Sequence, residues 1–363
     1  MPPPLRRQIG QLLFGSFPSH TVPVELRALA REFDLGGAIF FARNVEVPEQ
    51  VAELAAECRE LGQSAPAWVS VDQEGGRVAR LKAPFTKWPP MATLGRAASP
   101  ALVGRFGKAL AAELKAVGVT LDYAPVLDIL TNPKNPVIGD RALSTRPEQV
   151  AELGAALVRA LQGEGVAACG KHFPGHGDTV ADSHVELPLV EHGPDRLRAT
   201  EFVPFRAAIA ADVAFIMTAH VLVPSIDETR PATLSRPVLS MLRDELGFQG
   251  PVLTDDLDMQ AVRGRWAPPE SAVAAIAAGC DGVLVCQGDV DVQAATLEAL
   301  VRAVEQDTVP RARVEEALAR MARAKARFMS GEPMPVRSRL RAWKDVVGCD
   351  AHQAVAEEMA AFL

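Results

Sequence analysis

Short apolar runs alternate along this chain with longer stretches that are apolar on one face only. Most of the short runs are continuous rather than strictly alternating, which is typical of parallel strands covered on both faces. The sequence predicts strands at residues 11–17, 36–41, 67–72, 120–128, 166–173, 214–221, 251–256 and 282–286.

The longer stretches predict helices between these strands, because their apolar residues recur at intervals of three and four. The predicted helices are residues 47–61, 100–118, 146–165, 195–211, 235–248, 271–279, 291–306 and 311–329. The stretch 195–211 contains Pro204, so that helix is expected to be kinked or split.

This alternation predicts an α/β protein built as a single (β/α)8 TIM-type barrel with extra C-terminal helices. Residues 1–330 are assigned to the catalytic barrel and residues 331–363 to a C-terminal extension packed on its outside. A doubly wound open sheet is the alternative. It is disfavoured because no G-x-G-x-x-G follows the first strand.

Composition narrows the class of partner. The net charge of −7 argues against nucleic acid, and no apolar run is long enough to span a membrane. The N-terminal residues lack the pattern of a secretory signal, and the five cysteines are widely spaced. We therefore expect reduced thiols in a cytoplasmic protein, with Cys169 and Cys286 as strand core residues.

Polar side chains gather where the predicted strands end, which is where barrel enzymes carry their active sites. These residues are Asp72, Glu74, Arg77, Arg80, Asp128, Asn135, Asp140, Arg141, Lys171, His172, His220, Asp255, Asp256 and Asp258. A polyhydroxylated, partly charged ligand would need such a set. Many strand-end aspartates instead cap helices or accept loop amides, and His220 is equally compatible with a packed, hydrogen-bonded side chain.

Asp255 and Asp256 are neighbours, and side chains alternate across a strand. We expect at most one of them to be a reactive carboxylate facing the barrel mouth. The spacing alone does not choose between them. Trp88 and Trp266 are candidates for stacking on a sugar, although core packing explains each of them better.

The stretch KHFPGHGDTVADSH, residues 171–184, is the densest in reactive groups. A metal site is disfavoured because Pro174 and Gly175 break the helix that H-x-x-x-H ligation needs, and no further ligand completes a familiar set. In extended backbone, Asp182 and His184 point the same way, so the carboxylate can orient the imidazole for acid/base chemistry.

Four motifs together resemble the bacterial β-N-acetylglucosaminidases of glycoside hydrolase family 3. They are VDQEGGRVAR, VIGDRALS, KHFPGHGDTVADSH and LTDDLDM, and the likeness runs from about residue 10 to about residue 330. The loop ending in D-S-H is typical of the hexosaminidase branch. The family's usual serine before the nucleophile is Thr254 here.

The resemblance implies a role for each matching residue. Asp255 corresponds to the nucleophile, and His184 to the general acid/base with Asp182 as its partner. The residues implied to bind the sugar are Asp72, Arg80, Arg141, Lys171 and His172. No metal and no cofactor are expected.

The resemblance further implies a retaining exo-β-N-acetylglucosaminidase that acts in peptidoglycan recycling on N-acetylglucosamine joined β-1,4 to anhydro-muramic acid, with or without peptide. We expect a saccharide (muropeptide) ligand and a cytoplasmic monomer without nucleic-acid or membrane partners. The alternatives are a phosphorylase using the same residues, a β-glycosidase of other sugar preference, catalysis by the substrate's acetamido group, a metal-dependent hydrolase and a silent sugar-binding barrel.

Overall fold

A computed structural model describes residues 3–183, 186–330 and 343–363. Within these residues, eight parallel strands close into a barrel in the order β1-β10-β9-β8-β7-β6-β3-β2. The strands are β1 (Leu13–Gly15), β2 (Gly37–Phe40), β3 (Trp68–Val71), β6 (Leu121–Asp122), β7 (Ala167–Phe173), β8 (Phe215–Thr218), β9 (Val252–Asp256) and β10 (Gly282–Val285). The barrel predicted from the sequence is confirmed, and each predicted strand contains an observed one.

The continuous apolar runs are explained by burial on both sides of the barrel wall. Alternate residues of each strand fill the interior, where Trp68 meets Phe215 edge to face with ring centroids 5.1 Å apart. The intervening residues, such as Val69 and Ile216, pack outward under the helices. Both sets are withdrawn from water, so neither position favours a polar residue.

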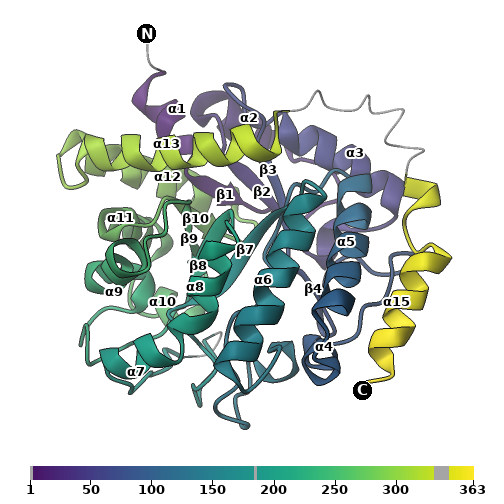
Figure 1. The fold of residues 1–363 in the computed structure, drawn as a ribbon. Coiled ribbons are helices and arrows are strands. Elements are labelled where there is room, and N and C mark those ends of the chain that lie inside the picture. Colours follow the sequence, from purple (N-terminus) through teal and green to yellow (C-terminus); the bar gives the residue numbers. More distant parts are fainter. Residues whose placement is uncertain (1–2, 184–185, 331–342) are drawn as a thin grey trace.

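The helices form a ring around the barrel (Figure 1). They are α1 (Leu5–Gly10), α2 (Val24–Phe33), α3 (Pro48–Arg59), α4 (Met91–Ala97), α5 (Pro100–Ala116), α6 (Pro147–Gly163), α7 (Pro194–Ala199), α8 (Phe202–Ala210), α9 (Arg236–Ser240), α10 (Gln260–Arg263), α11 (Pro268–Ala278), α12 (Val290–Glu305), α13 (Arg311–Phe328) and α15 (Asp350–Ala360). Several begin with proline, whose fixed φ suits the first helical turn and whose missing N–H costs nothing there.

The predicted helix 195–211 is split into α7 and α8, but the break precedes Pro204. Pro204 lies in the first turn of α8, where its missing N–H is tolerated. The predicted helix 235–248 is shorter, since α9 continues only as a π-helical turn over Met241–Glu245. The helices α1, α2, α4 and α10 were not predicted from the sequence, nor was a two-stranded hairpin directly after β3, made of β4 (Gln73–Gly75) and β5 (Val78–Ala79).

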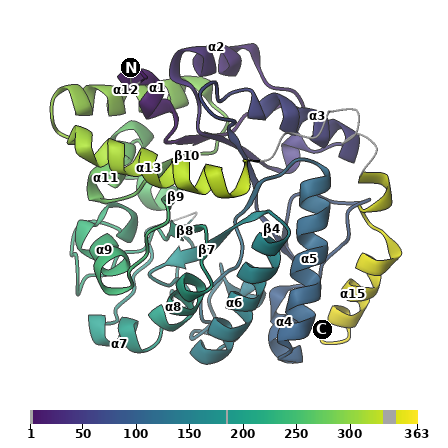
Figure 2. The same cartoon turned by 45° about the horizontal axis from the view of Figure 1, so that its top comes forward.

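Helix α13 crosses the amino-terminal end of the barrel (Figures 1 and 2). Its Met321 and Ala324 join the interior cluster, and the Phe328 ring packs on Trp68 with centroids 6.5 Å apart. This end is thereby closed, which leaves the carboxyl end of the strands to hold a ligand.

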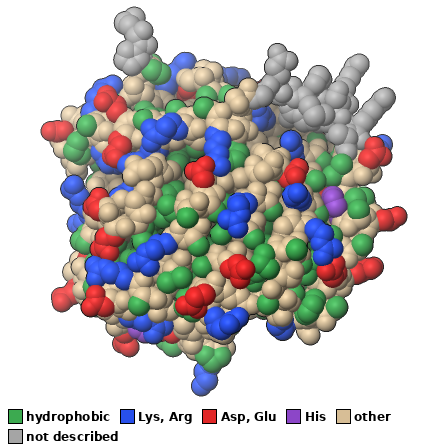
Figure 3. Space-filling view, viewed as in Figure 1, with side chains coloured by type: hydrophobic (Ala, Val, Ile, Leu, Met, Phe, Trp, Pro, Cys, Tyr) green, Lys and Arg blue, Asp and Glu red, His purple; other side chains and the backbone are tan. Residues whose placement is uncertain are grey.

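Helix α15 lies outside the ring, beside α5 and α4 (Figures 1 and 2). The boundary at residues 330/331 stays a prediction, because residues 331–342 lie outside the described part of the chain. Basic and acidic side chains are interspersed over the face of the molecule shown in Figure 3. None of the helices in the described ranges has the length and apolar character needed to cross a bilayer.

Candidate active site

A cavity of about 700 Å³ opens at the carboxyl ends of the strands. Several strands contribute to its wall: Asp72 follows β3, Lys171 and His172 lie near the end of β7, and Asp255 lies near the end of β9. Parallel strands bring these ends together although the residues are far apart in sequence. A cavity of this size accommodates a small polar ligand such as a sugar.

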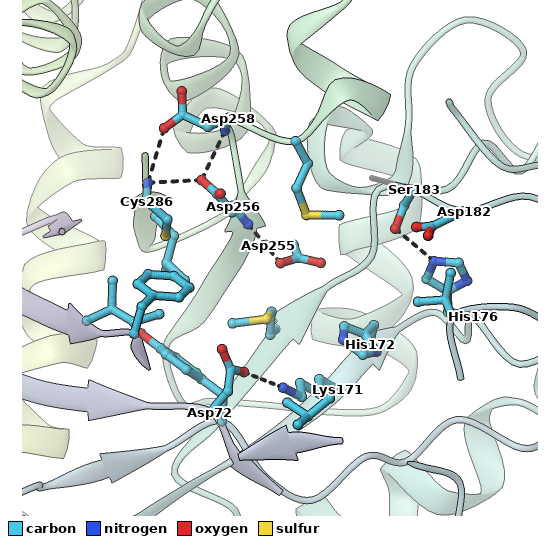
Figure 4. A pocket seen from close by; sticks show the side chains of 18 of the residues that line it. Asp72, Lys171, His172, His176, Asp182, Ser183, Asp255, Asp256, Asp258 and Cys286 are labelled. Atoms are coloured by element: carbon cyan, nitrogen blue, oxygen red, sulfur yellow. Dashed lines mark hydrogen bonds and ion pairs between the residues drawn. The ribbon is translucent and has the colours of Figure 1, made fainter. Parts of the chain in front are cut away.

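The predicted site residues that the structure describes all line this cavity, and Figure 4 labels several of them. They are Asp72, Arg80, Arg141, Lys171, His172, Asp182 and Asp255. The predicted acid/base residue His184 lies outside the described residues.

Two carboxylates and two cations form one network on the β3–β7 side of the cavity. Lys171 Nζ lies 2.7 Å from Asp72 Oδ1 and 2.7 Å from Glu74 Oε1. Arg141 donates two 2.8 Å bonds to the two oxygens of Glu74. Lys171, Glu74 and Arg141 are buried, and such charges are tolerated in a protein interior only when they are paired in this way.

The network fixes the ionisation of its buried members Lys171 and Glu74. Burial lowers the pKa of Lys171, but Asp72 and Glu74 outweigh that effect and hold the pKa above its ordinary value. Burial raises the pKa of Glu74, yet Arg141 and Lys171 leave it well below the usual range. Lys171 is therefore a cation and Glu74 an anion at neutral pH. Of the two carboxylates in the network, Asp72 is the one that lines the cavity, and it contacts Lys171.

Asp128 fixes the orientation of His172. Its Oδ2 lies 2.6 Å from His172 Nδ1, and its Oδ1 accepts a 2.7 Å bond from the backbone N–H of His176. Burial raises the pKa of Asp128, but His172 and His176 lower it below the ordinary value overall. With Nδ1 held by a carboxylate, the Nε2 side of the ring is left for the cavity that His172 lines.

Asp255 and Asp256 both touch the cavity wall, but their carboxylates differ in direction (Figure 4). The Asp255 carboxylate points to the middle of the cavity. Asp256 Oδ1 instead accepts 3.0 Å bonds from the backbone N–H groups of Asp258 and Cys286. The expectation that neighbouring aspartates differ in orientation agrees with this arrangement.

The two neighbours also differ in ionisation. Burial raises the pKa of Asp255, but His220, His172 and Lys171 together with an N–H bond from Asp256 leave it below the ordinary value. Burial, with the charges of Asp258 and Asp255, raises the pKa of Asp256 to about 7. Asp255 is thus the member of this pair that is ionised at neutral pH and faces the cavity.

The loop after β7 is fastened to itself by His176. Its Nδ1 lies 2.7 Å from Thr179 Oγ1, and its Nε2 lies 3.1 Å from Ser183 Oγ. Burial lowers the pKa of His176 to about 4, so the ring is neutral at ordinary pH. Ser183 is adjacent to Asp182, which faces the same cavity (Figure 4). His176 thereby holds the chain segment that carries Asp182.

Other strand-end residues have structural partners. His220 is buried, with Nδ1 2.8 Å from Thr233 Oγ1 and Nε2 2.9 Å from the carbonyl oxygen of Asp256. Arg77 donates to the carbonyl oxygens of Val137 and Ile138 in the loop after β6 and pairs with Asp140.

Two further expectations concern the core. Trp88 is buried there, as expected. Cys286 directly follows β10 and belongs to the buried cluster inside the barrel, as expected for a core residue, and it also lines the cavity. Among residues 3–183, 186–330 and 343–363, no three histidine, cysteine or acidic side chains are grouped as a metal site.

Sequence reasoning missed the parts played by Asp128 and His176. Asp128 was noted only as one of several polar residues after a strand, and His176 only as part of the dense stretch 171–184, with no partner assigned to either. The hydrophobic pattern around these two residues does not indicate which side chain each of them contacts. The contacts come from separate loops and depend on the closure of the barrel.

Comparison with known proteins identifies the family. The sequence matches the Glycosyl hydrolase family 3 N terminal domain over residues 4–324. A β-hexosaminidase of Nitrosomonas eutropha is 45% identical over 258 residues, which cover 69% of this chain and 74% of that protein. One of Thiobacillus denitrificans is 43% identical over 259 residues, covering 69% and 71%.

Solved structures of similar proteins support the same family assignment. The glycoside hydrolase family 3 β-N-acetylglucosaminidase of Paenibacillus sp. FPU-7 superposes with a TM-score of 0.93 at 39% identity, covering 99% of this chain and 69% of that one. The β-N-acetylhexosaminidase of Beutenbergia cavernae gives 0.83 at 30% identity, covering 90% and 99%. A closed barrel with a polar cavity at its carboxyl end, together with a family match over most of the chain, shows that this protein belongs to glycoside hydrolase family 3.

Proposed function

We propose that this protein is a retaining exo-β-N-acetylglucosaminidase that removes terminal β-linked N-acetylglucosamine. The observation that carries the proposal is the Asp255 carboxylate, which is ionised and aimed into a cavity lined by Lys171, His172 and Arg141. Glycosidic cleavage needs an anion to meet the positive charge that develops at the anomeric carbon. The relatives named β-hexosaminidase support the choice of sugar.

In the first step, an oxygen of Asp255 attacks the anomeric carbon while the bond from that carbon to the leaving oxygen breaks. The leaving oxygen takes a proton from His184, and a covalent glycosyl-Asp255 intermediate remains. In the second step, neutral His184 removes a proton from water, whose oxygen displaces Asp255 from the same carbon. Two displacements return the original configuration.

Asp182 and His184 form the proposed acid/base pair. Support comes from Asp182, which lines the same cavity as Asp255. A neighbouring carboxylate favours the imidazolium, and an unperturbed histidine titrates near pH 6.5, so a donor is available near neutrality. Asp72, Arg80, Arg141, Lys171 and His172 are proposed to hold the hydroxyl and acetamido groups of the sugar.

The proposed substrate is N-acetylglucosamine linked β-1,4 to anhydro-muramic acid or its peptides, released during peptidoglycan recycling in the cytoplasm. Arg43 and Arg263 on the cavity wall suit an aglycone that carries carboxylates. The active species is proposed to be a monomer, with residues 1–330 as the catalytic unit.

Paired chromogenic substrates test this function. We expect turnover of the β-N-acetylglucosaminide and little turnover of the β-glucoside, and the reverse preference would contradict the sugar assignment. A mechanism-based fluorinated sugar is expected to label Asp255, which mass spectrometry of the digested protein detects. Rapid turnover with no label on Asp255 would instead support attack by the acetamido group.

Phosphorolysis is the second candidate, because the same cavity arginines suit a phosphate ion in place of water. Product analysis with and without inorganic phosphate separates the two. Hydrolysis gives only free N-acetylglucosamine, whereas phosphorolysis gives the sugar 1-phosphate in the phosphate-containing reaction.

A further inference from the structure

Glu113 is a buried carboxylate on α5 that lies outside the active-site cavity, with 2% of its surface exposed. It accepts bonds from two separate segments. From the segment between β5 and α4, Thr86 donates its backbone N–H at 3.0 Å and its hydroxyl at 2.6 Å. From the C-terminal segment, the backbone N–H of Gly348 and the Nδ1 of His352 each lie 2.9 Å away.

Apolar packing joins the same three parts of the chain. The Trp88 ring meets Phe106 of α5 edge to face at 5.1 Å and lies 6.5 Å from the His352 ring of α15. Val347 and Met359 belong to the same buried cluster as Trp88. The segment from Leu81 to Met91 is therefore held by α5 and by the C-terminal segment together.

This segment continues directly from the hairpin β4–β5, and the two are tied together. The backbone N–H of Gly76 donates to the carbonyl oxygen of Trp88 at 2.9 Å. At Gly75, with φ of +111°, a side chain would meet Met91 Cε and the Pro89 carbonyl at 2.9 Å. The hairpin therefore packs closely against the Trp88–Met91 segment, and we expect a shift of one to move the other.

The hairpin region carries cavity residues. Gln73 Oε1 accepts 2.8 and 3.0 Å bonds from the N–H groups of Arg80 and Leu81, and Gln73 Nε2 donates to the carbonyl oxygen of Leu81. Arg80 lines the cavity and lies 3.5 Å from Asp72. A continuous set of contacts thus leads from His352 through Glu113, Thr86 and Trp88 to a side chain proposed to bind the sugar.

We infer that residues 343–363 position the Arg80 side of the sugar site, with Glu113 and His352 as positioning residues. The segment lies beyond the family match, which ends at residue 324, so nothing in that match accounts for it. The inference rests on the proposed function for its kinetic readout. It assigns the C-terminal segment to sugar binding rather than to the chemical step, because Asp255 lies on β9, on the other side of the barrel from β3.

The test compares three single variants with the wild-type full chain. His352→Ala removes one of the four groups that bond to the Glu113 carboxylate, and His352→Asn keeps a side-chain N–H near the position of Nδ1. Glu358→Gln is the matched control, because Glu358 makes an exposed 2.6 Å ion pair between α15 and Arg105 of α5 that does not involve Glu113. Each variant is assayed for KM and kcat on the chromogenic N-acetylglucosaminide.

We expect His352→Ala to raise KM by about tenfold with kcat changed by less than about threefold, since sugar binding is loosened while Asp255 stays in place. His352→Asn is expected to restore most of the affinity, and Glu358→Gln to match the wild type. Unchanged KM in His352→Ala, or a fall in kcat and thermal stability without a change in KM, would overturn the inference.

Hydrogen exchange supplies a readout that does not depend on the proposed reaction. His352→Ala is expected to accelerate exchange in the peptides covering residues 73–80 and 81–91, whereas Glu358→Gln leaves it unchanged. If the wild type fails to cleave the chromogenic sugar, the proposed function is wrong, while faster exchange confined to these peptides would still support the positioning role. Exchange in His352→Ala identical to that in the wild type would contradict the positioning role.

Discussion

The Asp128 carboxylate holds the His172 ring from behind, with Oδ2 2.6 Å from Nδ1, and the ring in turn lines the cavity. The same carboxylate accepts a bond from the backbone N–H of His176, so one buried group orients both a cavity-facing imidazole and the start of the loop that carries Asp182. Because this pair is buried, it is sensitive to substitution of either residue: removing one partner leaves the other with a polar atom that water cannot reach.

We predict that Asp128→Asn lowers kcat/KM by about 10- to 100-fold, because the amide can favour the wrong tautomer of His172. Steady-state kinetics on the chromogenic N-acetylglucosaminide measure the loss. Asp178→Asn serves as the control, since Asp178 pairs with His192 at 2.8 Å in a part-exposed position of the same loop. Equal losses in the two variants would show that loop stability, rather than the His172 ring, is responsible.

Asp255 and Asp256 are predicted to differ sharply although they are neighbours. Asp255→Asn should reduce kcat by at least about a thousandfold, because the amide cannot form the glycosyl ester. Asp256→Asn should stay within about tenfold of the wild type, since the pKa of Asp256 is raised to about 7 and its Oδ1 accepts backbone N–H groups as an amide oxygen can. Single-turnover rates compare them. A larger loss for Asp256→Asn would reassign the nucleophile.

His176 is predicted to give the protein a pH-dependent stability. Burial lowers its folded-state pKa to about 4 from an ordinary 6.5, so in this interval the unfolded chain binds the proton that the folded chain excludes. The contribution of neutral His176 to the free energy of unfolding is therefore fully present above pH 6.5 and is lost as the pH drops towards 4. Urea titrations of the wild type and His176→Gln across this range measure the difference. Parallel profiles for the two proteins would contradict the assignment.

The Glu74 carboxylate is predicted to be required for stability. Glu74→Gln leaves Lys171 and Arg141 buried without their shared anion, which should cost about 3–5 kcal/mol of unfolding free energy. The exposed pair of Arg198 with Glu245 gives the control, and Glu245→Gln should cost less than about 1 kcal/mol. Urea denaturation measures both. A cost below 1 kcal/mol for Glu74→Gln as well would mean that water reaches the network.

Hydrophobic patterning by itself determined the barrel. Each strand is buried on both faces, so its sequence is a continuous apolar run, and the run is visible without any knowledge of its partners. The helices with strong one-sided patterns, such as α5 and α6, were equally readable. Helix α2 was missed despite its apolar face, and the hairpin β4–β5 was missed because Gln73–Gly75 and Val78–Ala79 are too short to form a pattern.

The position of the polar residues after the predicted strands also placed them at one end of the barrel. Only the tertiary structure decided which group each of them contacts. Asp255 and Asp256 have the same chemistry and adjacent positions. They differ because only Asp256 accepts bonds from the backbone N–H groups of Asp258 and Cys286. Likewise, the pairing of Asp128 with His172 and of Glu113 with His352 joins residues far apart in the chain. Periodicity reports which side of an element is buried. The identity of the group that a buried side chain meets depends on how distant elements close around it.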